Sequence, residues 1–219
     1  ARQKIEHAAL GASPYFCIFA AMNLLLRSLI WVRRFRHRCG YGVHSPFAFN
    51  LLTGVVYEKG EFYAYAPLQA LRSESKGREK DDRLMLRLAN DHRPESCLAI
   101  LPEAEVTHRY LKAGCRSAQT KHAAQWDVNV EATLQAWGKV GMLYLDHPQW
   151  ASLLEKALPY TDEHTLIVIK GICRNSRSRQ AWQQVQEKEQ VRVTFDLYHF
   201  GLAYCRQRLN KQHYVVNYF

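Results

Sequence analysis

The spacing of apolar and polar positions changes character at Pro94. Beyond it, short apolar runs alternate with longer amphipathic stretches, which is typical of a parallel sheet with crossover helices. The runs predict strands over Ser96–Leu101, Val140–Asp146 and Thr165–Lys170, with a short second strand over Arg116–Gln119. Helices are expected between these strands, over Glu103–Lys112, Val130–Trp137, Gln149–Leu158 and Arg177–Glu189.

The end of the chain has a different texture. Val191–His199, Gly201–Arg206 and Tyr214–Phe219 are rich in β-formers, and the first two are nearly contiguous. The parallel units therefore finish in antiparallel strands. The pattern predicts a Rossmann-like α/β fold: a mostly parallel sheet with helices on both faces and a C-terminal antiparallel β-hairpin, preceded by an N-terminal helical segment.

The residues before Pro94 read as helices. Ser45 can cap free amides and Pro46 suits a first helical position, so a helix is expected from there to about Tyr57. Further helices are expected over Glu61–Arg72 and Lys80–Asn90. The chain then divides into an N-terminal basic and apolar segment (1–39), a helical lead-in (40–94) and the α/β domain (95–219).

Length and cysteine usage restrict the class of protein. The 219 residues suffice for one well-packed domain with an appendage. The six cysteines form no C-x-x-C pair and have no metal-ligand spacing with the histidines, so no zinc site is expected. A reduced, cytoplasmic protein fits this usage best.

Much of the net charge of +10 lies in the N-terminal segment, which has no acidic residue between Glu6 and Glu58. The apolar run from Tyr15 to Val32 is interrupted by Asn23 and Arg27, so it is a poor membrane-spanning candidate. A basic amphipathic helix can pack on its own domain, or bind nucleic acid or an anionic membrane surface. The arginines for such binding are Arg27, Arg33, Arg34, Arg36 and Arg38. Residues 1–21, ahead of Met22, are expected to be an upstream extension.

Several short stretches point to one family. They are Gly42–Phe49 (G-V-H-S-P-F-A-F), Leu143–His147 (L-Y-L-D-H), Ala181-Trp182 and the closing run Phe195–Leu202. Together they resemble class I S-adenosylmethionine-dependent methyltransferase-like proteins of the Bacteroidetes type, over residues 40–219. The resemblance implies a methyltransferase scaffold and an S-adenosylmethionine site at the strand ends, where Leu101, Glu103, Gln119 and Asp146 stand.

The chain departs from this family where the cofactor would bind. The glycine-rich turn after the first strand is replaced by Leu101-Pro102-Glu103-Ala104-Glu105. Pro102 removes an amide donor, and the glutamates oppose a cofactor carboxylate at a helix N-terminus. Gln119 stands where the family has an acid for the ribose hydroxyls, and Lys170-Gly171 replaces an acidic pair, so no metal is expected.

The candidate catalytic residues are Asp146, His147 and His44, and each has a structural alternative. Asp146 follows a strand at the ligand-binding edge and His147 beside it could act as a general base, but Asp146 could instead cap the next helix. His44 could instead pack locally. A phosphate could be held at the mouth of the sheet by four cations, or these could belong to a solvated loop and helix face: Lys170, Arg174, Arg177 and Arg179.

Three functions follow from these features. The first is a divergent methyltransferase-like protein whose cofactor site is degraded. The second is an active methyltransferase with an unusual cofactor loop, in which Asp146 or His147 helps to deprotonate an acceptor that the sequence does not identify. The third is a non-catalytic module that binds RNA or anionic lipid through its arginine-rich N-terminal helix.

Overall fold

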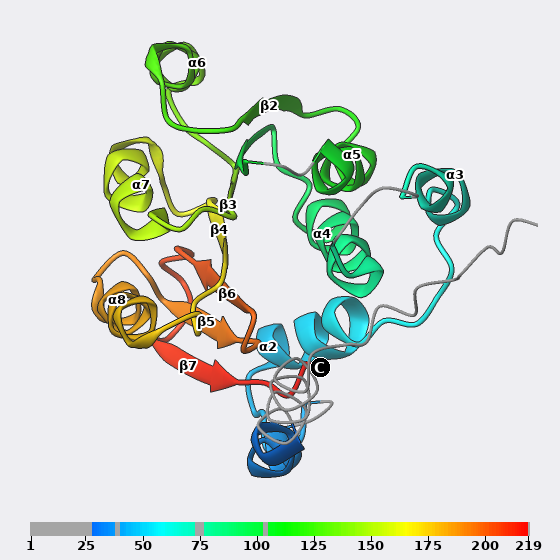
Figure 1. Cartoon of the computed structure of the whole chain (residues 1–219). Coiled ribbons are helices and arrows are strands. Elements are labelled where there is room, and N and C mark those ends of the chain that lie inside the picture. Colours follow the sequence, from blue (N-terminus) through cyan, green and yellow to red (C-terminus); the bar gives the residue numbers. More distant parts are fainter. Residues whose placement is uncertain (1–27, 38–39, 73–76, 103–104, 219) are drawn as a thin grey trace, which may run out of the picture.

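A seven-stranded mixed sheet forms the centre of the part of the chain that the computed structural model describes, residues 28–37, 40–72, 77–102 and 105–218 (Figure 1). Its order is β2-β1-β3-β4-β6-β5-β7. The strands are β1 (Ser96–Ile100), β2 (Gln119–Ala123), β3 (Met142–Leu145), β4 (Leu166–Lys170), β5 (Val193–Asp196), β6 (Phe200–Tyr204) and β7 (Gln212–Val215).

The strand directions confirm the predicted architecture. Strands β2, β1, β3 and β4 are parallel, β6 lies antiparallel between β4 and β5, and β7 pairs parallel with β5. The expected C-terminal antiparallel hairpin is β5–β6. The fold is therefore a Rossmann-like, mostly parallel sheet with an antiparallel hairpin near its end.

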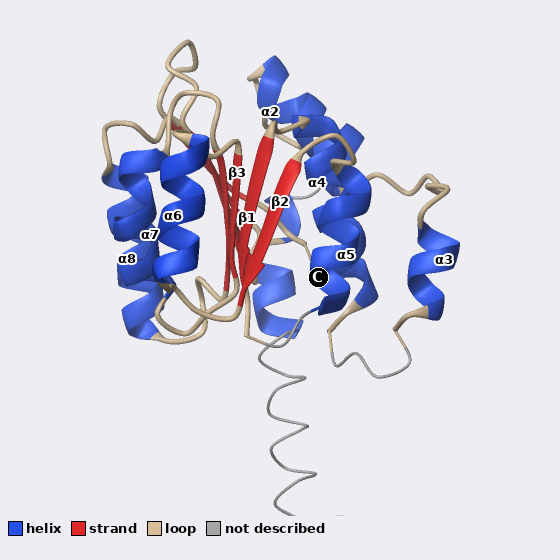
Figure 2. Ribbon diagram, turned by 90° about the horizontal axis from the view of Figure 1, so that it is seen from above, coloured by secondary structure: helices blue, strands red, loops and turns tan. Residues whose placement is uncertain are grey.

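Helices cover both faces of this sheet (Figure 2). One face carries α4 (Glu79–His92) and α5 (Glu105–Gly114), and the other carries α6 (Val128–Trp137), α7 (Trp150–Ala157) and α8 (Ser176–Glu187). Alternate strand residues enter separate cores, as Cys97 and Ala99 do on the first side and Leu98 and Ile100 on the second. Because both faces are covered, the central strands are apolar throughout rather than alternating.

The helical lead-in follows its predicted start. The side chain of Ser45 accepts a hydrogen bond from the amide of Ala48, and α2 (Pro46–Leu51) continues into a π-helical turn, η2 (Leu52–Val56). The helix expected over Glu61–Arg72 is shorter: α3 spans Tyr65–Ala70. Short 3₁₀ turns complete the described elements at η1 (Phe35–His37) and η3 (Leu158–Tyr160).

The second strand is displaced from its predicted position. The prediction of a strand over Arg116–Gln119 is wrong, because β2 begins at Gln119 and ends at Ala123. Arg116 and Ser117 form the turn between α5 and β2. The strand is an exposed or half-buried edge, so it lacks the apolar run that marks the buried strands.

The N-terminal helix, of which residues 28–33 are described, is attached to the far end of the chain. The guanidinium of Arg34 forms a bidentate pair with the carboxylate of Asp196, with both contacts at 3.0 Å, and also donates to the carbonyl of Val216. The amide of Asn217 donates to the carbonyl of His37. This attachment is polar, and Arg34 is used within the fold rather than presented to a partner.

The close approach of α4 and α5 requires a residue without a Cβ at position 114, where the chain has Gly114. A Cβ placed there would lie 2.9 Å from the Cβ of Ala89 and would collide with the carbonyl oxygen of Leu86. Gly114→Ala should lower the free energy of unfolding by about 1 to 3 kcal/mol, because the two helices must separate. Gly54→Ala is the control, since nothing lies within 4 Å of the added atom. Urea unfolding of both variants checks this, and equal midpoints would contradict the packing described.

Candidate functional site

The topology places one crevice at the carboxyl ends of β1 and β3. The chain leaves β1 for β2 through α5 on one face, and reaches β3 on the other side of β1 through α6 on the opposite face. Open α/β sheets bind ligands at such a switch point, outside the carboxyl ends of the strands. Leu101 follows β1 and Asp146 follows β3, so both lie at this crevice.

Asp146 is held by two cations from the end of β4 and the loop after it. The ammonium of Lys170 donates to one carboxylate oxygen at 2.7 Å, and the guanidinium of Arg174 lies 3.8 Å from the other. The Asp146 side chain is only 16% exposed. The structure therefore directs Lys170 and Arg174 at a carboxylate of the same chain.

Asp146 does not cap the next helix, so that interpretation is wrong. Helix α7 begins at Trp150 with Gln149 at its N-cap position, and no side chain caps it there. His147 forms the turn instead: its Nδ1 accepts from the amide of Gln149 at 3.1 Å, and its carbonyl accepts from the amide of Trp150. One ring nitrogen of the candidate base is thus used in a local turn.

The backbone at the end of β1 is also occupied. Leu101 is fully buried, its amide donates to the carbonyl of Ala123, and its carbonyl contacts Nε2 of His122 at 3.2 Å. Both polar groups of this residue are therefore bonded to the end of β2. Glu103, expected at the same turn, lies outside the described residues.

Gln119 lies at the amino ends of the parallel strands, opposite the end that carries the crevice. It pairs with Ser96 at the start of β1, whereas the residue beside the end of β1 is Ala123. The crevice-side end of β2 therefore reads Ala123-Ala124-Gln125-Trp126, which contains no carboxylate. The predicted position of Gln119 was wrong because the predicted strand was too early.

His44 is likewise separated from Asp146. Phe47, three residues later, packs its ring against Tyr204, with centroids 5.0 Å apart, and Tyr204 pairs with Leu166 at the start of β4. The start of β4 belongs to the amino edge of the parallel strands. His44 is exposed near that edge, so the structure brings Asp146 and His147 together but not His44.

Two acidic residues that the sequence did not single out lie at the same edge as Asp146. Helix α4 runs back toward the start of β1, so its first turn places Asp81 and Asp82 at the carboxyl edge. Asp82 accepts from the hydroxyl of Thr107 at 2.6 Å and pairs with Arg72. Asp82, Thr107 and Arg72 come from separate segments of the chain and meet here. No local sequence motif predicts this contact.

Burial dominates the electrostatics of this edge. It raises the pKa of Asp81, while Arg78 and then Lys170 act in the opposite direction. Burial also raises the pKa of Tyr144 well above its usual range, and the negative charges of Asp146, Asp82 and Asp81 add to the effect. We call the charged residues of this edge the carboxyl-edge cluster: Arg72, Arg78, Asp81, Asp82, Asp146, Lys170 and Arg174.

Metal-binding geometry is not found in the described part of the chain. There, no group of three or more His, Cys, Asp or Glu side chains is arranged to hold a metal ion. The described cysteines are unpaired thiols: Cys97, Cys115, Cys173 and Cys205.

Comparisons with known proteins place the fold. No family model matches the chain, and no curated protein matches its sequence. Among solved structures, the SAH-bound methyltransferase PaMTH1 of Podospora anserina aligns with a TM-score of 0.51 at 8% sequence identity, covering 73% of this chain and 95% of that one. Cofactor-bound Rv0187 from MTB aligns with a TM-score of 0.49 at 13% identity, covering 66% and 89%. This chain has the Rossmann-like methyltransferase fold.

The likeness to PaMTH1 concerns the fold alone at this identity. Membership of the Bacteroidetes-type family stays a prediction from the short stretches around His44 and Asp146. In this fold the crevice beside Asp146 is the expected ligand-binding position. The chemistry there depends on the residues of this chain.

The Asp146–Lys170 pair can be tested by its energetic coupling. Asp146→Asn should lower the free energy of unfolding because it leaves the Lys170 ammonium, 31% exposed, without its carboxylate. Lys170→Met should partly rescue that loss, with a coupling energy of about 1 to 2 kcal/mol in a double-mutant cycle. Urea unfolding of the four proteins measures it. Strictly additive effects would show that the pair contributes nothing.

Proposed function

We propose that this chain is a methyltransferase-fold protein whose crevice no longer binds S-adenosylmethionine. The observation that supports this most directly is the pairing of Asp146 with Lys170 at 2.7 Å. Asp146 is the acid at the end of β3, where the resemblance to methyltransferases implies a cofactor contact. One oxygen of this carboxylate already accepts from Lys170 and the other lies 3.8 Å from Arg174, so a ligand donor would compete with both cations for Asp146.

Charge strengthens this argument. S-adenosylmethionine carries a positive sulfonium and an ammonium group besides its carboxylate, so it is a net cation, and the crevice presents the cations Lys170 and Arg174 beside Asp146. A cofactor donor that takes the place of Lys170 or Arg174 on Asp146 would break one of these pairs. Breaking a partly buried ion pair leaves an uncompensated charge, which costs more than the pair itself contributes.

The backbone turn adds a second obstacle. Leu101 and Pro102 replace the glycines that allow a ligand to approach the strand-to-helix corner closely, and Pro102 has no amide to donate. The end of β2 supplies Ala123 where a ribose hydroxyl would need an acidic acceptor. These residues do not fit the cofactor, so no methyl-transfer step is derived from them.

Calorimetric titration of the full chain with S-adenosylmethionine tests the proposal. No binding is expected up to 1 mM ligand, which is on the order of 100-fold above a dissociation constant of about 10 μM. Binding of that strength would stabilise the folded state by about 2.7 kcal/mol and shift thermal unfolding upward. Because no binding is expected, the unfolding transition should not shift. PaMTH1, which was crystallised with SAH bound, is the matched positive control.

A micromolar dissociation constant would overturn the proposal and favour an active enzyme with an unusual cofactor loop. In that case Asp146→Asn separates the roles. Loss of methyl transfer with retained cofactor binding would assign Asp146 to the acceptor side. Full activity would leave His147 as the remaining candidate base.

A second candidate function rests on the N-terminal helix, and here we propose docking to an anionic lipid surface. Leu29 and Val32 are 65% and 64% exposed, and Phe35 continues the same face. Arg33 and Arg36 are exposed beside them. Solvent-facing aliphatic side chains flanked by arginines suit a membrane interface better than RNA, which offers these side chains no apolar partner.

The other arginines contribute differently. Arg34 is used in its pair with Asp196, and Arg27 and Arg38 lie outside the described residues. Within the described residues, no helix combines the length and apolarity needed to cross a bilayer. The proposal is therefore a helix that lies on the surface, held by its apolar face and by Arg33 and Arg36.

Co-sedimentation of the full chain with phosphatidylserine vesicles tests this docking. Replacing both Arg33 and Arg36 with Gln should weaken partitioning by roughly 30-fold, at about 1 kcal/mol for each arginine near the surface. Arg208→Gln, an exposed arginine after β6, should change partitioning far less. The variant Leu29→Gln with Val32→Gln should also lose binding. Unaltered vesicle binding in that variant, or preferential capture of single-stranded RNA, would refute lipid docking.

A further inference from the structure

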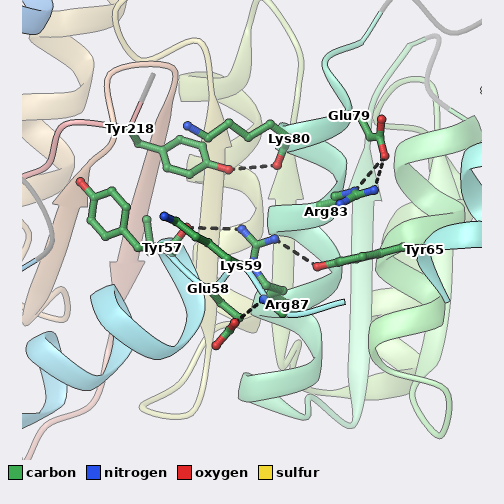
Figure 3. A pocket seen from close by; sticks show the side chains of 11 residues that line it. Tyr57, Glu58, Lys59, Tyr65, Glu79, Lys80, Arg83, Arg87 and Tyr218 are labelled. Carbon is green, nitrogen blue, oxygen red and sulfur yellow. Dashed lines mark hydrogen bonds and ion pairs between the residues drawn. The ribbon is translucent and has the colours of Figure 1, made fainter. Parts of the chain in front are cut away.

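A cavity of about 440 Å³ lies between the outer face of α4, the segment after η2, and Tyr218 (Figure 3). It is separate from the crevice beside Asp146. Lys80, Arg83 and Arg87 recur at helical spacing and line this cavity, whereas Leu84, Met85 and Leu88 of the same helix enter the core beneath the sheet. Its volume is in the range of small-molecule sites.

Arg87 forms the fixed inner wall of this cavity. Its side chain lies between Tyr57 and Tyr65 in Figure 3, and the residue is 6% exposed. Its guanidinium donates to the carbonyls of Val55 and Val56, at 2.7 and 3.3 Å, and to the hydroxyl of Tyr65 at 3.1 Å. All three acceptors are uncharged, so these hydrogen bonds orient the cation without neutralising it.

Lys80 contributes a second cation with a lowered proton affinity. Its ammonium lies 3.9 Å from the centre of the Tyr218 ring. Burial, followed by the positive charges of Arg78 and Arg87, lowers its pKa to about 8, against an opposing effect of Asp81. A bound anion would offset the repulsion from Arg78 and Arg87 and raise that pKa.

The lining as a whole is positive. It has four cations against two carboxylates: Lys59, Lys80, Arg83 and Arg87 against Glu58 and Glu79. Glu79 is bound to Arg83 at 2.7 Å, and Glu58 accepts from the amide of Gly60. The excess of two positive charges matches the charge of a phosphate monoester near pH 7.

Aromatic walls complete the cavity and are held in place. The hydroxyl of Tyr57 donates to the carbonyl of Asn217 at 2.6 Å, and that of Tyr218 donates to the carbonyl of Lys80 at 2.9 Å. Tyr65 is fixed by Arg87. Arg83 and Lys80 lie over the rings of Tyr65 and Tyr218. The half-buried Tyr57 can accept a flat ring, because offset or edge contacts between aromatic groups are favourable.

From this arrangement we propose that the cavity binds a small phosphate monoester whose ring lies against the tyrosine walls. The phosphate is held by Lys80 and Arg87, with Lys59 close by, and the ring contacts the half-buried Tyr57. Arg87 provides a planar donor group and Lys80 a compact charge, a combination suited to phosphate oxygens.

The test is calorimetry of the full chain at pH 7 with phenyl phosphate, and with inorganic phosphate for comparison. Phenyl phosphate is expected to bind severalfold more tightly, because only it reaches the tyrosines. Lys80→Gln should weaken phenyl phosphate binding by on the order of tenfold. Lys112→Gln, which removes the same charge from the exposed end of α5, should leave binding unchanged.

Proton linkage supplies a signature that a merely structural lysine would not give. The anion favours protonated Lys80, so affinity should be highest below pH 8 and fall as the pH rises to 9 in the wild type, but not in Lys80→Gln. In the wild type, saturating phenyl phosphate should also slow the acetylation of Lys80 at pH 8, read by mass spectrometry. This second measurement needs no variant to fold.

Three results would overturn the proposal. They are no heat with 10 mM phenyl phosphate added to folded protein, equal weakening by Lys80→Gln and Lys112→Gln, and unprotected Lys80 at saturation. Equal affinity for inorganic and phenyl phosphate would show that the ring makes no favourable contact, which contradicts the aromatic part of the proposal. None of these outcomes bears on S-adenosylmethionine, since the crevice beside Asp146 does not share its residues with this cavity.

Discussion

The ion pair between Asp146 and Lys170 joins the carboxyl ends of β3 and β4 at the crevice of this fold. Parallel strands bring their carboxyl ends to one edge, so any charges placed there meet one another or meet a ligand. In this chain they meet one another: Lys170 at the end of β4 satisfies the acid at the end of β3. The carboxyl-edge cluster extends the same principle to Asp82, which is bound by Thr107 and Arg72. The scaffold keeps its shape while its polar groups are used internally.

The buried parts of the fold could be predicted because burial leaves a local signal. The apolar runs at β1, β3 and β4 and the Ser45-Pro46 helix start are each contained within a few residues. Strand β2 has no such signal, since Gln119–Ala123 is an edge that faces solvent along much of its length. Because β2 was predicted too early, Gln119 was expected at the carboxyl end of the strand, whereas it lies at the amino end. Edge strands are therefore the elements for which a pattern of apolar residues is least informative.

The position of Asp146 at a strand end could be predicted from the sequence, but its contacts could not. The position of Asp146 after a strand was visible in the sequence, as were Lys170 and Arg174, but not that these three bind one another. The Asp146–Lys170 pair spans 24 residues and depends on the order of the strands. The local reading of Asp146 as a helix cap was wrong because His147 forms that turn. The cavity around Arg87 is harder still to predict from the sequence, because its walls come from four separate segments: η2, α3, α4 and the segment after β7.

The attachment of Arg34 to Asp196 and Val216 has a consequence for synthesis. The partners of this arginine lie 162 and 182 residues further along the chain. At translation rates of about 5 to 20 residues per second, the N-terminal helix waits roughly 10 to 40 s before its docking surface exists. During that interval Arg34 lacks the partners that hold this helix to the domain, while Leu29 and Val32 are exposed both before and after docking. The N-terminal helix is thus the first described part of the chain to be synthesised and among the last to dock on its own domain.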